Sequence, residues 1–151
     1  MKNGYLPLSV FFPAYNEEAN VRESIVRMQE ALQSITPVYE IIVVNDGSSD
    51  NTRTVAEAIA AKDPEHIRVV NHEKNQGCGA AVLSGIEAAR YKWVFFTDAD
   101  LQFDPEELRM LTQYAGQYKV VIGYRAKRQD PFMRLVNAWG WNRLNRLFFG
   151  L

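Results

Sequence analysis

Two aspartates separated by a single residue form the part of the sequence best suited to chemistry. Asp98 and Asp100 directly follow residues 93–97, an apolar run that predicts a strand, so both carboxylates can face one crevice at the strand's end. Such a pair repels itself unless a cation neutralises it. Mg²⁺ held by one or two carboxylates and substrate phosphates fits this arrangement, and Gln102 can supply a neutral oxygen ligand. The alternative is a simple turn, but Asp104 already provides the N-cap that the next helix needs.

Polar side chains also follow the first two predicted strands. Asp46 comes after the apolar run 40–44, where its carboxylate could accept hydrogen bonds from a nucleobase or a ribose. The alternative is an Asx turn before Gly47. Tyr15 could stack on a base or be a partly buried aromatic residue, and Glu17 lies in a predicted first helical turn, where a carboxylate also complements the helix dipole.

A glycine-rich stretch follows the third predicted strand. Gly77-x-Gly79-x-x-Val82 resembles part of a dinucleotide-binding fingerprint, and Asp98 stands about 20 residues further on. Because valine replaces the third glycine and the stretch does not follow the first strand, a nicotinamide-cofactor enzyme is disfavoured. Cys78 has no evident histidine partner, so we interpret it as a small structural residue.

Strands and helices are predicted to alternate along the chain. Apolar runs predict strands at residues 8–12 (ended by Pro13), 40–44, 67–70, 93–97 and 120–122, and periodic patterns predict helices at 19–34, 52–62, 77–89 and 104–118. The third of these helices is rich in small residues and could pack close to the sheet. This alternation predicts an α/β fold with a mostly parallel central sheet, in which ligands lie beyond the carboxyl ends of the strands.

Length and composition exclude several other classes of protein. The chain has 151 residues, of which 47% are apolar and 23% charged, and these are ordinary values for a soluble globular domain rather than for a disordered or collagen-like chain. A single cysteine excludes a disulfide scaffold. The sequence lacks a signal-peptide pattern and a long apolar run, so we expect a cytoplasmic protein.

The C-terminal part differs from the rest in charge. After residue 123 one acid, Asp130, stands against six basic residues: Arg125, Lys127, Arg128, Arg134, Arg143 and Arg146. Residues 131–151 predict a basic helix with aromatic residues on two faces, and either a membrane surface or further protein could cover the second face. We therefore expect a body of residues 1–130 followed by an amphipathic helix of residues 131–151, the latter cut short.

Four motifs in a fixed order resemble those of family 2 glycosyltransferases of GT-A fold. They are FFPAYNEE at residues 11–18, VVNDGSSDNT at 43–52, NxGxGA at 75–80 and TDADLQ at 97–102. The last motif and the basic continuation are most similar to the polyprenyl-phosphate branch of that family, which includes dolichol-phosphate mannose synthase. The resemblance implies a Rossmann-like three-layer sandwich.

The same resemblance implies roles for the matched residues, with Asp98, Asp100 and Arg125 at the catalytic centre. The nucleotide pocket would be lined by Pro13, Ala14, Tyr15, Glu17, Val44 and Asp46, and the donor diphosphate would lie along Asp98, Ala99 and Asp100. Mg²⁺ or Mn²⁺ would be held by Asp98, Asp100 and Gln102, donor or acceptor phosphate by Arg125, and acceptor phosphate also by Arg134.

The expected reaction moves a sugar from a nucleotide-sugar, of GDP-mannose or UDP-glucose type, to a dolichyl or undecaprenyl phosphate. A phosphate monoester has a second pKa of about 6, so this acceptor is largely ionised at neutral pH and needs no strong general base. The expected location is the cytoplasmic face of a membrane, with the protein bound peripherally. No nucleic-acid partner is expected.

Two alternatives stay open. One is a family 2 transferase with a saccharide acceptor, which would need a carboxylate base that the sequence does not identify. The other is a catalytically incomplete fragment that holds a nucleotide-sugar without turnover, because chains of the resembling family usually continue further.

Overall fold

The computed structural model describes residues 6–99, 104–123, 139–141, 143, 144, 146 and 147. It divides the chain into two compact units, residues 1–119 and residues 120–151, and each is described by itself. Asp100, Gln102, Arg125 and Arg134 lie outside the described residues, as does the expected boundary after residue 130.

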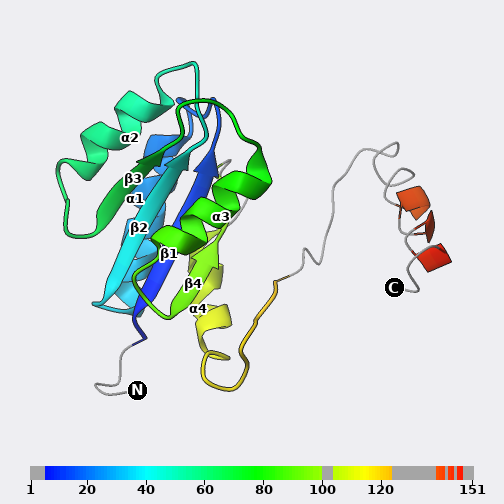
Figure 1. Cartoon of the computed structure of the whole chain (residues 1–151). Coiled ribbons are helices and arrows are strands. Elements are labelled where there is room, and N and C mark those ends of the chain that lie inside the picture. Colours follow the sequence, from blue (N-terminus) through cyan, green and yellow to red (C-terminus); the bar gives the residue numbers. More distant parts are fainter. Residues whose placement is uncertain (1–5, 100–103, 124–138, 142, 145, 148–151) are drawn as a thin grey trace. The chain divides into compact units, whose positions relative to one another are not determined.

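A parallel sheet of four strands forms the centre of the first unit (Figure 1). The strands are β1 (Leu8–Ala14), β2 (Tyr39–Asn45), β3 (Ile67–Asn71) and β4 (Trp93–Phe96), in the spatial order β3-β2-β1-β4. The chain thus moves outward from β1 to β3 and then crosses back to place β4 on the other side of β1. Such a reversal of strand order leaves a crevice at the carboxyl ends of the two strands that flank it.

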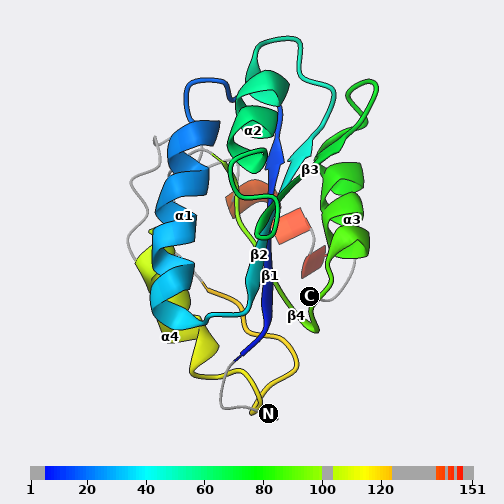
Figure 2. The same ribbon diagram turned by 90° about the vertical axis from the view of Figure 1, so that its left-hand side faces the viewer.

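Helices cover both faces of this sheet (Figure 2). The helix α1 (Val21–Ile35), the helix α2 (Thr52–Ala60) and the short α4 (Leu108–Thr112), preceded by the 3₁₀ turn η1 (Pro105–Glu107), lie on one face. The helix α3 (Cys78–Ala88) lies on the other face. The predicted three-layer α/β architecture is confirmed.

The core follows the alternation of side chains along the strands. Val10 and Phe12 of β1 point into the larger apolar cluster, which includes α1 and α2, whereas Phe11 points into the smaller cluster beneath α3. Every residue of β2 is buried, as expected for a central strand covered on both faces.

The first strand does not end at Pro13, contrary to the prediction. Phe11 O accepts from Thr97 N, and alternate residues of a parallel strand bond to opposite neighbours, so Pro13 directs its backbone towards β4. The pairing of β1 with β4 ends at Phe11 and Phe96. The ladder therefore needs no backbone N–H at position 13, and proline is tolerated there.

Two predictions for the segment after β4 are wrong. The helix expected to reach residue 118 ends at Thr112, and the chain continues in hydrogen-bonded turns to Gly116, whose φ of +94° is incompatible with a continuing helix. Residues 120–122 do not form the expected fifth strand, because within the described residues they have no ladder partner. Val120 and Ile122 are exposed instead, Ile122 to 82%, and Val121 is half-buried.

The described residues of the predicted C-terminal helix have helical backbone. Within this second unit the guanidinium carbon of Arg143 lies 5.8 Å from the ring centroid of Trp139, a cation–π contact. Across the described part of the chain, the helices are too short or too polar to cross a membrane.

Candidate functional site

A pocket of about 320 Å³ opens at the carboxyl ends of β1, β2 and β4. Its walls are Pro13, Ala14, Tyr15, Glu17, Asp46, Asn75, Cys78, Ala81, Asp98 and Ala99. They come from segments that are far apart in the sequence, and the parallel sheet brings those segments to one edge.

Most of the predicted donor-binding residues that the structure describes meet in this pocket. The two acids Asp46 and Asp98 lie on its wall together with residues 13–15, Glu17 and Ala99. Val44 lies apart, because its side chain is fully buried with Phe11 in the cluster beneath α3. Any contact between Val44 and a ligand would have to come from its backbone.

Three pocket residues, Asn75, Cys78 and Ala81, were not predicted as site residues. Cys78 is exposed and opens α3 at the pocket wall. The signal that could have identified these residues is the position of the glycine-rich stretch, directly after the carboxyl end of a parallel strand.

Asp46 has the most heavily hydrogen-bonded side chain of the pocket residues that the structure describes. One carboxylate oxygen, Oδ1, lies 2.7 Å from Nδ1 of His72 and accepts from the Gln76 amide at 2.8 Å. The other, Oδ2, accepts from the Gly77 amide at 2.9 Å. Burial raises the pKa of Asp46, but these hydrogen bonds outweigh burial and lower the pKa below its ordinary value. Asp46 is therefore an anion that binds the loop after β3.

The Asx-turn alternative for Asp46 is not what the structure shows. Its neighbour Asn45 bonds the following loop, accepting from the Ser48 amide at 3.1 Å. The carboxylate of Asp46 is left facing the pocket with three donors already in place, and one acceptor direction of Oδ2 remains for a ligand.

Two neighbouring loops hold Tyr15 and Glu17 in place. Asn16, at φ 56°, donates its amide to Ser48 Oγ and accepts from the Ser49 amide at 2.9 Å. The Glu17 amide donates to Thr52 Oγ1 at 2.8 Å. Tyr15 is 48% exposed at the pocket wall, so its ring is partly buried and still accessible to a planar ligand.

Asp98 follows β4 and is exposed at the pocket wall. The next residue, Ala99, is buried, and its carbonyl accepts from Ser24 Oγ of α1 at 2.9 Å, which fixes the backbone directly after Asp98. Among the described residues no group of three or more acidic, histidine or cysteine side chains is placed to hold a metal ion. Asp98 is the described member of the predicted ligand set, and its exposed carboxylate suits a hard divalent cation.

Comparison with known proteins gives one family and a set of related transferases. A family model described as glycosyl transferase family 2 matches residues 9–149. An undecaprenyl-phosphate 4-deoxy-4-formamido-L-arabinose transferase of Pseudomonas aeruginosa (strain LESB58) is 40% identical over 128 residues, which are 84% of this chain and 38% of that protein. A transferase of the same name from Pectobacterium carotovorum (strain PC1) is 43% identical over 129 residues, 84% of this chain and 39% of its own length. The chain thus spans about two fifths of these relatives.

Solved structures resemble this fold. A mannosyltransferase from Pyrobaculum calidifontis in complex with GDP-Man and Mn²⁺ superposes with a TM-score of 0.65 at 25% identity, over 74% of this chain and 33% of that one. The glucosyl-3-phosphoglycerate synthase of Mycobacterium tuberculosis, in complex with Mn²⁺, UDP and glucosyl-3-phosphoglycerate, gives 0.56 at 28% identity, over 75% and 40%.

Proposed function

Because the chain belongs to glycosyl transferase family 2, we propose that its pocket is the donor site of an enzyme that moves a sugar from a nucleotide-sugar to a polyprenyl phosphate. The predicted GT-A fold, a Rossmann-like sandwich, is confirmed by the solved relatives. The observation that carries the proposal is the meeting of Tyr15, Glu17, Asp46 and Asp98 in one pocket at the point where the strand order reverses.

The roles of the pocket residues follow from their chemistry. Tyr15 offers an exposed ring on which a nucleobase can stack, and the free acceptor direction of Asp46 suits a base or ribose donor. Asp98, with Asp100 and Gln102, would hold Mg²⁺ or Mn²⁺ as hard oxygen ligands. The ion, when bound, neutralises the charge that develops on the leaving nucleoside diphosphate.

The acceptor side of the proposal draws on the relatives, which are named undecaprenyl-phosphate transferases. A phosphate acceptor is already ionised near neutral pH, so the protein has to position two anions rather than supply a strong base. Arg125 is proposed to contact donor or acceptor phosphate, and Arg134 acceptor phosphate, since guanidinium binds phosphate bidentately. The basic C-terminal helix would then lie at the cytoplasmic face of a membrane, with the protein bound peripherally.

Calorimetric titration tests the donor site. UDP-glucose and GDP-mannose are titrated into the 151-residue chain, each with Mn²⁺ and with a chelator. We expect one of them to bind in a metal-dependent way, and Asp98→Asn to remove the metal dependence. The matched control is Glu106→Gln, an exposed carboxylate of η1 outside the pocket, which should bind as the wild type does. Binding of neither nucleotide-sugar by the folded chain would contradict the proposal.

The chain spans about two fifths of its relatives, which favours a second candidate function for this chain taken alone. In this candidate the chain is a binding fragment that holds the nucleotide-sugar without turnover. Incubation with the bound donor and undecaprenyl phosphate separates the candidates, because the enzyme releases nucleoside diphosphate whereas a binding fragment leaves the donor intact.

A further inference from the structure

We propose that His72 is a positioning residue of the pocket: it fixes the Asp46 carboxylate and, through it, the backbone of Gln76 and Gly77. The consequence for donor affinity rests on the proposed function. The positioning itself rests on three side chains that join β2, β3 and α3 in one hydrogen-bonded row.

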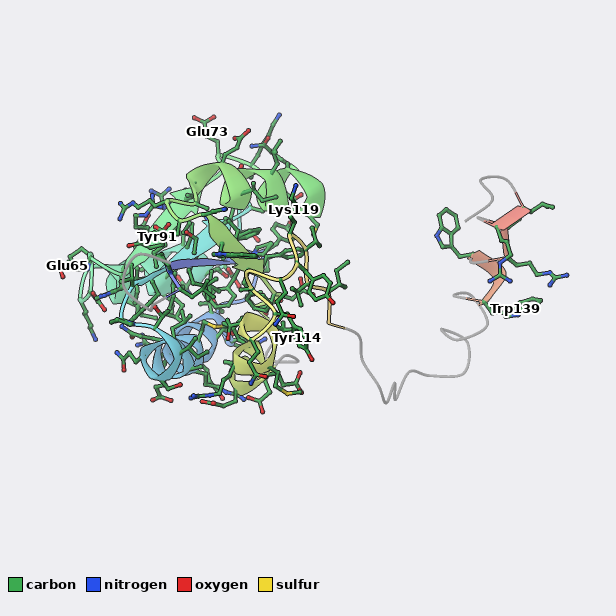
Figure 3. The ribbon with its side chains drawn as sticks, turned by 90° about the horizontal axis from the view of Figure 1, so that it is seen from below. Glu65, Glu73, Tyr91, Tyr114, Lys119 and Trp139 are labelled. Carbon is green, nitrogen blue, oxygen red and sulfur yellow. The ribbon has the colours of Figure 1, made fainter. Side chains whose placement is uncertain are left out.

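The row has short contacts and is almost closed to water. His72 directly follows β3, and its Nδ1 lies 2.7 Å from Asp46 Oδ1 while its Nε2 lies 2.9 Å from Ser84 Oγ in α3. The side chains of His72 and Asp46 are only 8% and 5% exposed. The next residue, Glu73, points away from the protein (Figure 3). The inward direction of His72 is therefore not shared by the residue that follows it.

The partners of the imidazole determine where its protons lie. Ionised Asp46 is an acceptor only, so Nδ1 of His72 must carry a hydrogen and donate it. In the neutral ring Nε2 is then an acceptor, and the hydroxyl of Ser84 donates to it. The hydrogen on Nδ1 of His72 is thus set by its contact with Asp46, in the neutral ring as in the charged one.

The row ends at the pocket wall. Gln76 and Gly77 donate their amides to Asp46, and the residues on either side of them, Asn75 and Cys78, line the pocket. Without the bond from His72, Asp46 would keep its two backbone donors but lose the side-chain contact that sets the plane of its carboxylate. The wall built from residues 75–78 would then lose its fixed position.

Three variants test this role in the full chain. His72→Ala removes both bonds of the ring, His72→Asn places an amide N–H near the position of Nδ1, and Ser84→Ala removes the other end of the row. His66→Ala is the matched control, since His66 bonds Asp63 and stacks on Tyr39 outside the pocket. Loss of a hydrogen bond to a charged group predicts an affinity for the nucleotide-sugar that falls about tenfold in His72→Ala, with recovery in His72→Asn and little change in the control.

A second measurement needs no ligand. Hydrogen exchange of the Gln76 amide in the free protein should be about tenfold faster in His72→Ala than in the wild type, because its acceptor, Asp46 Oδ1, is no longer held by His72. The imidazole ¹⁵N shifts of the wild type should report hydrogen on Nδ1 at neutral pH.

The outcomes separate the two claims. If the wild type binds neither UDP-glucose nor GDP-mannose, the proposed function fails, and the two ligand-free measurements decide the role of His72. If Gln76 exchanges equally slowly in His72→Ala, or if ¹⁵N shifts place the hydrogen on Nε2 alone, the inference is overturned. It is also overturned if His72→Asn is as impaired as His72→Ala, since only the volume of the ring would then matter.

Discussion

The ring of Phe11 in β1 lies against the backbone of Gly85 in α3, so close that a Cβ on Gly85 would overlap the ring. Phe11 also stacks on Phe96 of β4, with ring centroids 5.4 Å apart. The contact between helix and sheet therefore depends on the missing side chain at position 85, and it bears on the pocket because α3 carries Cys78 and Ala81.

Gly85→Ala should destabilise the protein despite the better helix propensity of alanine. Overpacking of this kind costs about 1–3 kcal/mol, which corresponds to a melting temperature lower by roughly 3–10 °C for a chain of this size. Gly79→Ala is the control in the same helix, because a Cβ there meets nothing within 4 Å. Thermal unfolding of both variants checks the prediction, and equal melting temperatures would contradict it.

At Gly47 the loop after β2 packs closely against the loop after β3. Its φ is +66°, and a Cβ would collide with the backbone of Lys74 and Asn75. Gly47→Ala should therefore cost more than the roughly 1–2 kcal/mol of left-handed strain alone, and it should weaken nucleotide-sugar binding by displacing Asn75. Gly116→Ala is the control, with φ +94° but open space around it. Denaturant unfolding measures both, and a cost in Gly47→Ala no larger than in the control would contradict the collision.

Glu40 is a buried carboxylate far along β2 from the pocket. It accepts from Ser9 Oγ at 2.7 Å, from the Arg90 amide at 2.6 Å and from the Arg68 guanidinium at 2.7 Å, and it is 1% exposed. Burial raises the pKa of Glu40, but the bonds from Arg90, Ser9 and Arg68 outweigh burial and lower the pKa below its ordinary value.

The stability that ionised Glu40 contributes should depend on pH. Because the pKa is lower in the folded state than the ordinary 4.5, this contribution is complete above pH 4.5 and is lost as the pH falls through the folded-state pKa. Glu40→Gln should cost about 1.5–3 kcal/mol at pH 7, the contribution of hydrogen bonds to a charged group, and the difference from wild type should shrink in acid. Glu23→Gln, which removes an exposed ion pair with Arg27, should cost under about 0.5 kcal/mol. A difference that is constant from pH 7 to pH 3 would contradict the assignment.

Cys78 offers a direct report on occupancy of the pocket, since it is the sole cysteine of the chain and is exposed at the pocket wall. A nucleotide-sugar with Mn²⁺, at ten times its dissociation constant, should slow alkylation of the thiol about tenfold, because about one site in eleven stays empty. Mass spectrometry of the labelled chain measures the rate. The same nucleotide-sugar with chelator should protect less, and unchanged labelling at saturation would show that the ligand binds elsewhere.

The sequence predicted the meeting of Asp46 and Asp98 because both follow strands of a parallel sheet, and the carboxyl ends of such strands share one edge of the sheet. It did not predict the bond between Asp46 and His72. That bond depends on the adjacency of β2 and β3 and on the direction of one side chain. The periodicity and spacing of the sequence predict neither. The sequence showed the glycine-rich motif that contains Asn75 and Cys78, but it did not predict that these residues line the pocket.

The errors in the predicted secondary structure have a common origin. Residues 120–122 have the composition of a strand, but strand formation is a property of a pair, and local composition does not supply the partner. The continuation of β1 through Pro13 likewise depends on where β4 ends, at Phe96. Local sequence signals gave correct predictions where neighbouring residues alone determine the structure. At Asp104, for example, the side chain accepts from the Glu106 amide as the capping pattern predicts.

The order β3-β2-β1-β4 also has a kinetic consequence. The pairs β1–β2 and β2–β3 join strands that are neighbours along the chain. By contrast, β4 pairs with β1 only after the whole intervening chain has folded back. For example, Ser9 Oγ accepts from the amide of Tyr91, which lies 82 residues later in the sequence. Closing so long a loop carries the largest entropy cost of the sheet. The docking of β4 should therefore be the last event of folding, and the pocket, which needs Asp98 beside Tyr15, should come into being only at that step.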